Sequence, residues 1–177
     1  MRRPVDAARV REFMRALGRE ADREGRAYLT GGSTAVLSGW RESTIDIDLK
    51  LEPESDRLLR AIAELKERLE LNLELASPDQ FIPELPGWRE RSPWIAREGK
   101  LDFHHYDLYA QALAKLERGH TQDRIDVDQL IARRLVETNE LMRCFAEIEP
   151  LLYRFPAIDP SSFRRAVETI VRETSTR

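Results

Sequence analysis

The sequence predicts an α+β fold, in which a small mixed β-sheet with flanking helices is followed by a helical C-terminal portion. Three observations predict it. Short segments before Tyr106 alternate apolar and polar residues, which is typical of strands. Segments with apolar residues three and four positions apart lie between them and indicate helices. From Tyr106 onward the pattern is helical, and Pro150, Pro156 and Pro160 interrupt it.

The length of 177 residues suits one well-cored domain. We expect a core over residues 1–105, including an N-terminal helix, and a helical portion over residues 106–177 packed on it as one compact unit. The hydrophobic content of 41% is that of a globular protein, and no apolar run is long enough to span a bilayer. The N-terminus lacks the continuous apolar centre of a signal peptide. We therefore expect a cytoplasmic protein with no membrane partner.

The first three elements follow from periodicity and from end signals. Residues 6–24 fit an amphipathic helix, and Asp6 is a suitable N-cap. The segment "RAYLTGG" fits a short strand that ends in a glycine pair. A helix is expected to begin at once from that pair, over residues 33–40.

The next segment, "STIDIDLKLE", alternates without interruption. Side chains of a strand point to opposite faces in turn, so Ile45 and Ile47 are expected on the apolar face. Asp46 and Asp48 are then expected together on the polar face.

Four further elements complete the expected core. Residues 55–70 fit a helix, and "LNLELAS" fits a strand with Glu74 on its polar face. The proline-rich residues 77–93 are expected to form a loop over the core, because proline cannot serve a central strand. The segment "WIAREGKLDFHHYD" predicts a hairpin that turns at Glu98 and Gly99.

Two features of this core carry chemistry. The pair Gly31 and Gly32 lets the backbone approach a ligand closely, and a helix starting there would favour an anion, with Ser33 as a further donor. Asp46 and Asp48, about 7 Å apart along one strand face, can both reach a divalent ion. Mg²⁺ prefers such oxygen ligands and recruits substrate phosphates to complete its shell.

The order of strand, glycine turn, helix and strand with an alternating acidic pair resembles the nucleotidyltransferase superfamily related to DNA polymerase β. Gly32, Ser33 and "IDIDL" match its signature. With "SPDQFIPELPGWRER", "YDLYAQALAKLERG" and "DRIDVDQL", the chain resembles the bacterial DUF6036 group of nucleotidyltransferase-like proteins, near the AbiEii toxin type. The resemblance covers roughly residues 30–130.

The resemblance implies a metal-dependent transfer of a nucleoside monophosphate from an NTP to a hydroxyl of a protein, an RNA or a small molecule. Asp46 and Asp48 would hold Mg²⁺ or Mn²⁺, and a third carboxylate usually comes from the strand after the next helix. Glu74 occupies that place, and Asp102 in "KLDFHH" is the alternative. A glutamate there departs from the superfamily's usual aspartate.

Basic residues offer further phosphate contacts. Lys115 in "ALAKLERG" could reach a phosphate as a point charge, or could extend to the solvent from an apolar surface. Arg41 and Arg118 offer the same chemistry in weaker contexts. The net charge of −3 does not indicate a nucleic-acid partner, although a local basic face would permit one.

A pair of histidines and a group of aspartates are expected to have structural roles. His104 and His105 adjoin on a strand and point to opposite faces, so we expect structural or hydrogen-bonding roles. Asp123, Asp126 and Asp128 lie near a helix start, where they complement the helix dipole.

A second function remains open beside the enzyme. The chain could be a non-catalytic module that binds nucleotide or a partner protein, such as one component of a toxin–antitoxin pair. The intact acidic pair favours the enzyme, and the lack of an unmistakable third carboxylate favours the module.

Overall fold

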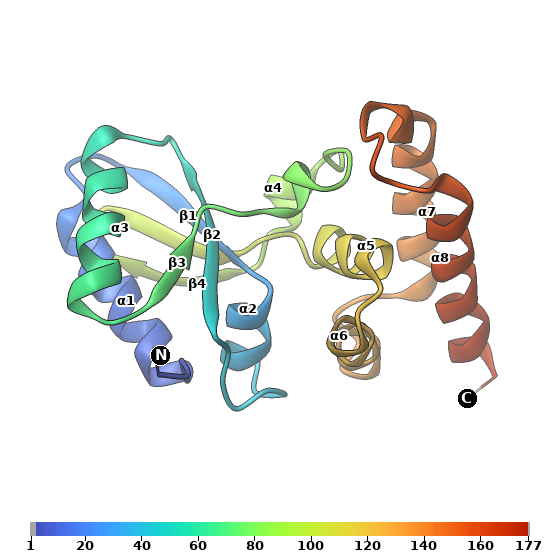
Figure 1. The fold of residues 1–177 in the computed structure, drawn as a ribbon, viewed down its shortest axis with the longest axis horizontal. Coiled ribbons are helices and arrows are strands. Elements are labelled where there is room, and N and C mark those ends of the chain that lie inside the picture. The colour runs from blue at the N-terminus through green and yellow to red at the C-terminus, as the bar shows by residue number, and fades with distance from the viewer. Residues whose placement is uncertain (1–2, 177) are drawn as a thin grey trace. The chain divides into compact units, whose positions relative to one another are not determined.

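The computed structural model describes residues 3–176 (Figure 1). It forms two compact units. The first, called the sheet unit here, comprises the described residues up to Ser77 together with Ser92–Tyr106. The second, the helical unit, comprises Pro78–Arg91 together with the described residues from Asp107 onward. Within residues 3–176, no helix has the length and apolar character needed to cross a membrane.

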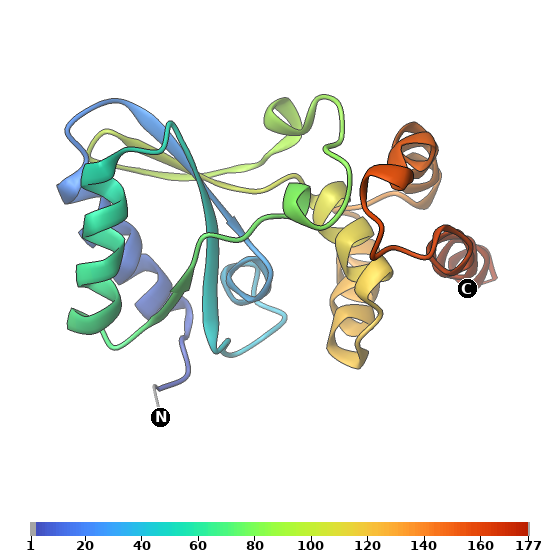
Figure 2. The same ribbon diagram turned by 45° about the horizontal axis from the view of Figure 1, so that its top comes forward.

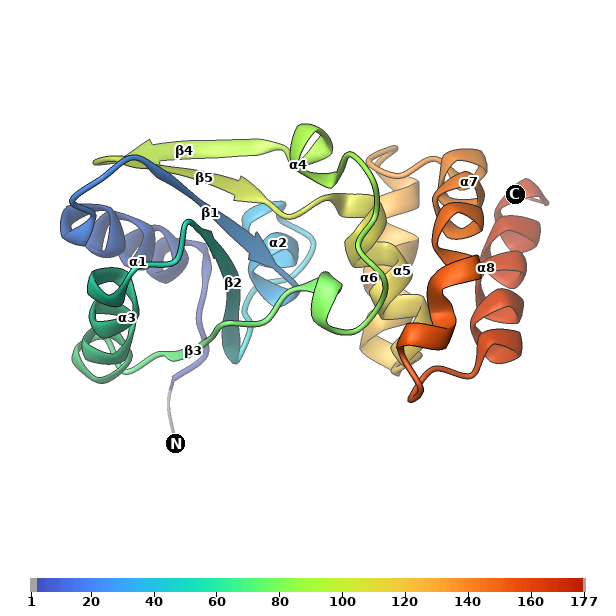
Figure 3. The ribbon, with the colours of Figure 1, turned by 90° about the horizontal axis from the view of Figure 1, so that it is seen from above.

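The sheet unit contains a five-stranded mixed sheet in the order β3-β2-β1-β5-β4, which confirms the predicted α+β class. Strand β1 is antiparallel to β2 and parallel to β5, while β3 runs parallel to β2 and β4 antiparallel to β5. Figure 3 shows the sheet from above. The strands are β1 (Gly25–Thr30), β2 (Asp46–Glu52), β3 (Asn72–Glu74), β4 (Trp94–Glu98) and β5 (Leu101–His105).

The predicted hairpin between β4 and β5 is confirmed. Gly99 in its turn has a φ of +60°, a left-handed conformation that glycine adopts without a Cβ clash. The turn brings Glu98 opposite Leu101.

Three helices belong to the sheet unit: α1 (Ala7–Glu20), α2 (Gly32–Leu37) and α3 (Asp56–Arg68). The predicted N-cap of α1 is confirmed, since the Asp6 carboxylate accepts a hydrogen bond from the Arg9 amide at 2.9 Å. The Ser55 hydroxyl caps α3 in the same way. All three helices are shorter than predicted, and α2 ends before Gly39, whose φ of +85° lies outside the helical range.

The core of the sheet unit lies between α1, α3 and one face of the sheet. Alternate residues of the strands point into it, as their period of two requires. Burying such side chains contributes about 1.5–3 kcal/mol each and fixes which face of every strand turns inward. The sheet contributes Ala27, Leu29, Ile47, Leu49, Leu51, Leu73, Leu101 and Phe103, and the helices contribute Val10, Phe13, Met14, Leu17, Leu58, Ala61, Ile62 and Leu65.

The placement of Ile45 on the apolar face is wrong. Strand β2 begins at Asp46, and Ile45 is 68% exposed. Thr44 instead pairs with Val5 in an isolated antiparallel bridge, through the hydrogen bonds Val5 N–H to Thr44 O at 2.7 Å and Thr44 N–H to Val5 O at 2.9 Å. This bridge diverts the chain just before the strand, so the alternation does not extend to Ile45.

The proline-rich segment is not a simple loop, as two short helical turns form within it. They are η1 (Pro78–Gln80) and α4 (Trp88–Arg91). Pro78 starts the first, a position where the missing proline N–H is not needed. Trp88 is 1% exposed and anchors the second.

The rest of the helical unit consists of α5 (Leu108–Arg118), α6 (Thr121–Ala132), α7 (Thr138–Ile148), η2 (Glu149–Arg154) and α8 (Pro160–Ser175). Helices α7 and α8 lie side by side (Figure 2). Between them the rings of Phe145 and Phe163 meet edge to face, with centroids 4.9 Å apart. Cys144 is buried, and burial raises its pKa to about 11.

Candidate functional site

The glycine turn and the acidic pair meet at one end of the sheet. In the pairing of β1 with β2, Thr30 lies opposite Asp48, and Gly31 follows Thr30 directly. Gly31 has a φ of +63° and a ψ of −129°, a conformation that residues with a Cβ rarely adopt. A Cβ at Gly31 would lie 3.1 Å from the Asp48 Oδ2 atom. The carboxylate of Asp48 therefore lies against the turn.

Glycine is required at position 32 because the Thr44 side chain lies close to its backbone. A Cβ at Gly32 would lie 2.0 Å from Thr44 Oγ1 and 3.2 Å from the Nη1 atom of Arg41. The loop that enters β2 thus packs directly on the turn. The sequence offers no signal for this contact, because it depends on the path of the chain between α2 and β2.

Helix α2 begins at the turn, as predicted, but it has only six residues. Ser33 is fully buried, and within the described chain its hydroxyl has no hydrogen-bond partner. A buried hydroxyl without a partner is costly and is often explained by a ligand or a water. It suits the donor role predicted for Ser33.

The predicted hydrogen-bonding role of the two histidines is confirmed. His105 Nδ1 lies 3.0 Å from Thr34 Oγ1 in α2, and His104 Nδ1 lies 3.0 Å from the Ser92 carbonyl. Burial, followed by the charges of Arg11 and His104, lowers the pKa of His105 to about 4. His105 is therefore neutral at pH 7, and its ring forms a hydrogen bond with the Thr34 hydroxyl.

Three predicted carboxylates lie on one face of adjacent strands. In the parallel pairing of β2 with β3, Asp46 lies opposite Asn72 and Asp48 opposite Glu74. Directly paired residues point to the same face, which is the face opposite the core. Asp46 and Asp48 are half-buried and Glu74 is exposed.

Asp102 lies elsewhere on the sheet. It is paired in register with Arg26, four residues before Thr30 on β1, which is about 13 Å along a strand. Its carboxylate accepts hydrogen bonds from Arg97 at 2.9 Å and from the Trp94 indole at 3.4 Å. Of the two alternatives for a third carboxylate, Glu74 is the one adjacent to Asp48.

The donor chemistry at this end of the sheet fits a hard divalent cation. Carboxylate oxygens from Asp46 and Asp48 are the ligands that Mg²⁺ and Mn²⁺ prefer. Among residues 3–176, no three or more His, Cys, Asp or Glu side chains converge to hold a metal. A bound cation would therefore need oxygens from the substrate, as is usual for Mg²⁺ in nucleotide sites.

Lys115 belongs to the helical unit, where it is 8% exposed. Its Nζ atom lies 2.7 Å from Asp126 Oδ2 and 3.6 Å from Asp123 Oδ1, and Arg118 donates two hydrogen bonds to Asp123. The dipole interpretation holds for Asp123, which accepts from the His120 amide at 3.2 Å. It is wrong for Asp126, which is fully buried because the packing of α6 on α5 turns it toward Lys115.

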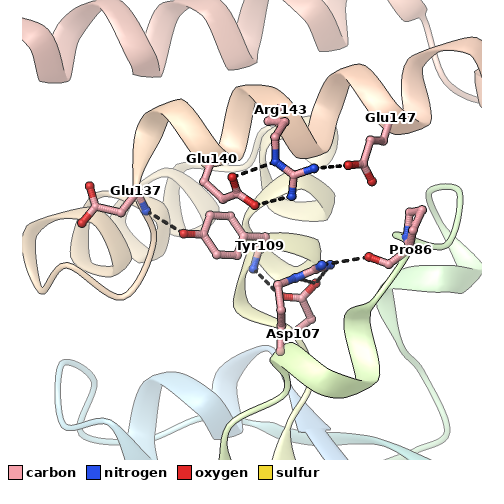
Figure 4. Close-up of polar contacts among 8 residues, drawn as sticks. Pro86, Asp107, Tyr109, Glu137, Glu140, Arg143 and Glu147 are labelled. Carbon is pink, nitrogen blue, oxygen red and sulfur yellow. Dashed lines mark hydrogen bonds and ion pairs between the residues drawn. The ribbon is translucent and has the colours of Figure 1, made fainter.

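A second polar network in the helical unit was not predicted (Figure 4). Arg91 donates to Asp107 Oδ2 from Nε at 3.1 Å and from Nη2 at 2.6 Å, and to the Pro86 carbonyl at 2.8 Å. Asp107 also caps α5 through the Tyr109 amide. Burial raises the pKa of Asp107, although Arg91 opposes the shift. The network fastens α4 to the start of α5.

On α7, Arg143 pairs with Glu140 and Glu147 one turn to either side (Figure 4). These pairs lie on the exposed face of the helix and suit a solvated surface. Nearby, the Tyr109 hydroxyl accepts a hydrogen bond from the Glu137 amide at 3.2 Å, which ties α5 to the start of α7.

Comparison with known proteins gives one match. Searches of curated proteins and of solved structures each found no match. The model of one protein family, described as "Nucleotidyltransferase of unknown function (DUF6036)", matches residues 7–173, which is most of the chain. The match takes in the glycine turn, the acidic pair and the helices that follow. The chain therefore belongs to the DUF6036 family of nucleotidyltransferases of unknown function.

Proposed function

We propose that the protein is a metal-dependent nucleotidyltransferase, which transfers a nucleoside monophosphate from an NTP to a hydroxyl of a protein, an RNA or a small molecule. One observation carries the proposal: the Asp48 carboxylate lies against the Gly31 turn, 3.1 Å from the position of the absent Cβ. A phosphate held at the turn would then be next to the carboxylates that hold its counter-ion. The family description supports the same class of reaction.

Each residue of the proposed site has a separate task. The Gly31–Gly32 turn would hold a phosphate beside Asp48, and the buried Ser33 hydroxyl would donate a hydrogen bond to it. Asp46 and Asp48 would hold Mg²⁺ or Mn²⁺, and Glu74 would serve as the third carboxylate. The cation, when bound, supplies neutralisation of the triphosphate charge and a lower pKa for the acceptor hydroxyl.

The reaction needs no nucleophilic side chain. The acceptor oxygen forms a bond to the α-phosphorus, the bond from that phosphorus to the bridging oxygen breaks, and pyrophosphate leaves. The hydroxyl proton passes to water. The residues of the site act by positioning the two reactants and by holding charge in fixed places.

The test is incubation of the purified protein with each α-labelled NTP, Mg²⁺ or Mn²⁺, and a cell extract, beside the double variant Asp46→Asn, Asp48→Asn. The variant keeps the size of both side chains and removes their charge. We expect label on a discrete acceptor with the wild type and none with the variant. Equal labelling by both proteins would contradict the proposal.

A non-catalytic module is the second candidate function. The observation that favours it is the lack, within residues 3–176, of a converged group of three or more metal ligands. Such a module would bind a nucleotide or a partner protein, for example as one component of a toxin–antitoxin pair of the AbiEii type. Nucleotide binding without metal-dependent release of pyrophosphate, from any of the four NTPs, would select it over the enzyme.

A further inference from the structure

The exposed face of α1 carries a row of arginines. Arg11, Arg15 and Arg19 are all exposed and recur every four residues of the helix. Residues four apart lie on one face of a helix, about 6 Å apart along its axis, so the three form a nearly straight row about 12 Å long. We call these three residues the arginine row. Figure 3 shows α1, which packs beside α3 in the sheet unit.

Neighbouring carboxylates do not neutralise the arginine row. Within residues 3–176, no carboxylate oxygen lies within 4 Å of a charged nitrogen of the row. Exposed arginines on other helices differ: Arg143 forms ion pairs with two glutamates of α7, and Arg164 of α8 pairs with Glu149 and Glu168. Glu12 is the one acidic residue among the exposed residues of α1. The face therefore presents a net positive charge to the solvent.

The composition of this face selects the kind of partner that it fits. Besides the arginine row, the exposed residues of α1 are Ala8 and Glu12, and the large apolar residues of the helix lie in the core. A helix that binds a membrane inserts an apolar face, and a stable protein interface has a largely apolar centre. This face offers neither. A phosphate backbone, in contrast, is bound mainly through charge.

We infer that the arginine row is a docking surface for the phosphate backbone of a single-stranded nucleic acid. A single strand can follow a straight row of cations because it is flexible, whereas the backbone of a duplex winds away from such a row. Phe13, the one aromatic residue of α1, is buried, so the helix offers no ring on which a base could stack. Binding is therefore independent of base sequence.

This surface is separate from the proposed nucleotide site. Helix α1 packs on the core face of the sheet, and Asp46 and Asp48 point to the opposite face. The inference therefore goes beyond the proposed function and does not depend on it.

The test is fluorescence anisotropy of a labelled oligouridine at several KCl concentrations. Each phosphate contact with a single strand contributes about −0.7 to the slope of log K against log salt, so three contacts predict a slope of about −2. We expect the triple variant Arg11→Gln, Arg15→Gln, Arg19→Gln to lose at least about tenfold in affinity at low salt. Glu12→Gln, which removes the one acidic group of the face, should bind more tightly than the wild type.

Arg164→Gln is the matched control, because it removes the same charge from an exposed arginine that already has carboxylate partners. It should keep the affinity and the slope of the wild type. Arg15→Lys keeps the charge and should also keep the slope. Glutamine and arginine have similar helix propensities, and thermal unfolding verifies that each variant is folded.

No binding by the folded wild type, or equal affinity of the wild type and the triple variant, would overturn the inference. An equal loss of affinity in Arg164→Gln would do the same. Tighter binding of an RNA duplex, of polyglutamate or of anionic phospholipid vesicles than of oligouridine would assign the row to that partner instead. The transfer assay is a separate measurement, so a failure of nucleotide transfer beside intact oligouridine binding would remove the proposed function alone.

Discussion

The ammonium group of Lys115 lies 2.7 Å from the Asp126 carboxylate in the interior of the helical unit, where both side chains are almost inaccessible to solvent. The pair joins α5 to α6, and Asp123 lies 3.6 Å from the same ammonium group. Removing either member of such a pair leaves the other as a buried charge without its partner, which is strongly unfavourable.

Removing one member of this pair should destabilise the protein. We expect Asp126→Ala to lower the free energy of unfolding by about 3 kcal/mol, because Lys115 is left buried with only the more distant Asp123. Urea denaturation followed by circular dichroism measures the change. Arg143→Gln, which removes only exposed pairs on α7, is the control and should cost less than about 1 kcal/mol. Equal losses in the two variants would show that the Lys115–Asp126 pair has no special weight.

Alanine variants at Gly31 and Gly39 distinguish the effect of a positive φ from the effect of a Cβ placed near Asp48. Both have positive φ, +63° and +85°, so alanine should cost about 1–3 kcal/mol of stability at either position. A Cβ at Gly31 would approach Asp48 Oδ2 to 3.1 Å, whereas within the described chain nothing lies within 4 Å of one at Gly39. We therefore expect Gly31→Ala alone to lose nucleotide transfer.

The measurements for this pair are thermal unfolding and the transfer assay, carried out on both variants at a temperature where each is folded. Transfer retained by Gly31→Ala, or lost equally in Gly39→Ala, would mean that the turn does not hold the phosphate.

The sequence predicts those features of the site that depend on neighbouring residues, and it does not predict contacts between residues far apart in the chain. Alternation along one strand is local, and it places Asp46 and Asp48 on one face correctly. The register that sets Thr30 opposite Asp48 depends on the packing of whole strands, and no local pattern contains it. The close approach of Thr44 to Gly32 depends on the path of the loop between α2 and β2.

The helical unit shows the same division. Periodicity predicts α5, α7 and α8, because the apolar stripe of each is a property of one segment. It does not predict that Asp126 is buried, because that depends on how α6 packs against α5. The isolated bridge between Val5 and Thr44 likewise joins distant parts of the chain, and it is the reason Ile45 leaves the alternation of β2.

Glu74 and Asp102 give a direct test of the third carboxylate. Glu74 is the register partner of Asp48. Asp102 lies on β5 opposite Arg26, at the far end of β1 from Thr30, and its carboxylate accepts a hydrogen bond from Arg97. We expect Glu74→Gln to lower the rate of transfer by about 10–100-fold, the loss typical of a weakened metal site. Asp102→Asn should leave the rate unchanged. The opposite ranking of the two rates would assign the third carboxylate to Asp102.

The stability of the protein should depend on pH through His105. Its pKa is lowered to about 4 in the folded protein, against 6.5 when exposed, so the unfolded state binds more protons between these values. Stability from this residue is therefore full above pH 6.5 and falls as the pH is lowered toward 4, by at most about 3 kcal/mol.

His105→Asn tests this dependence, since asparagine can still bond to Thr34 but does not titrate. The measurement is the free energy of unfolding from pH 5 to 7.5, a range above most carboxylate titrations. We expect a smaller slope with pH in the variant than in the wild type. The same slope in both would contradict the assignment of a depressed pKa to His105.

If the glycine turn and the acidic pair form one nucleotide site, a crystal structure with Mn²⁺ and a non-hydrolysable NTP analogue will show both ligands there. Anomalous scattering locates Mn²⁺ without ambiguity. We expect Mn²⁺ within about 2.0–2.3 Å of oxygens from Asp46 and Asp48, with the triphosphate against Gly31 and Gly32. Mn²⁺ or triphosphate bound away from this end of the sheet would contradict it.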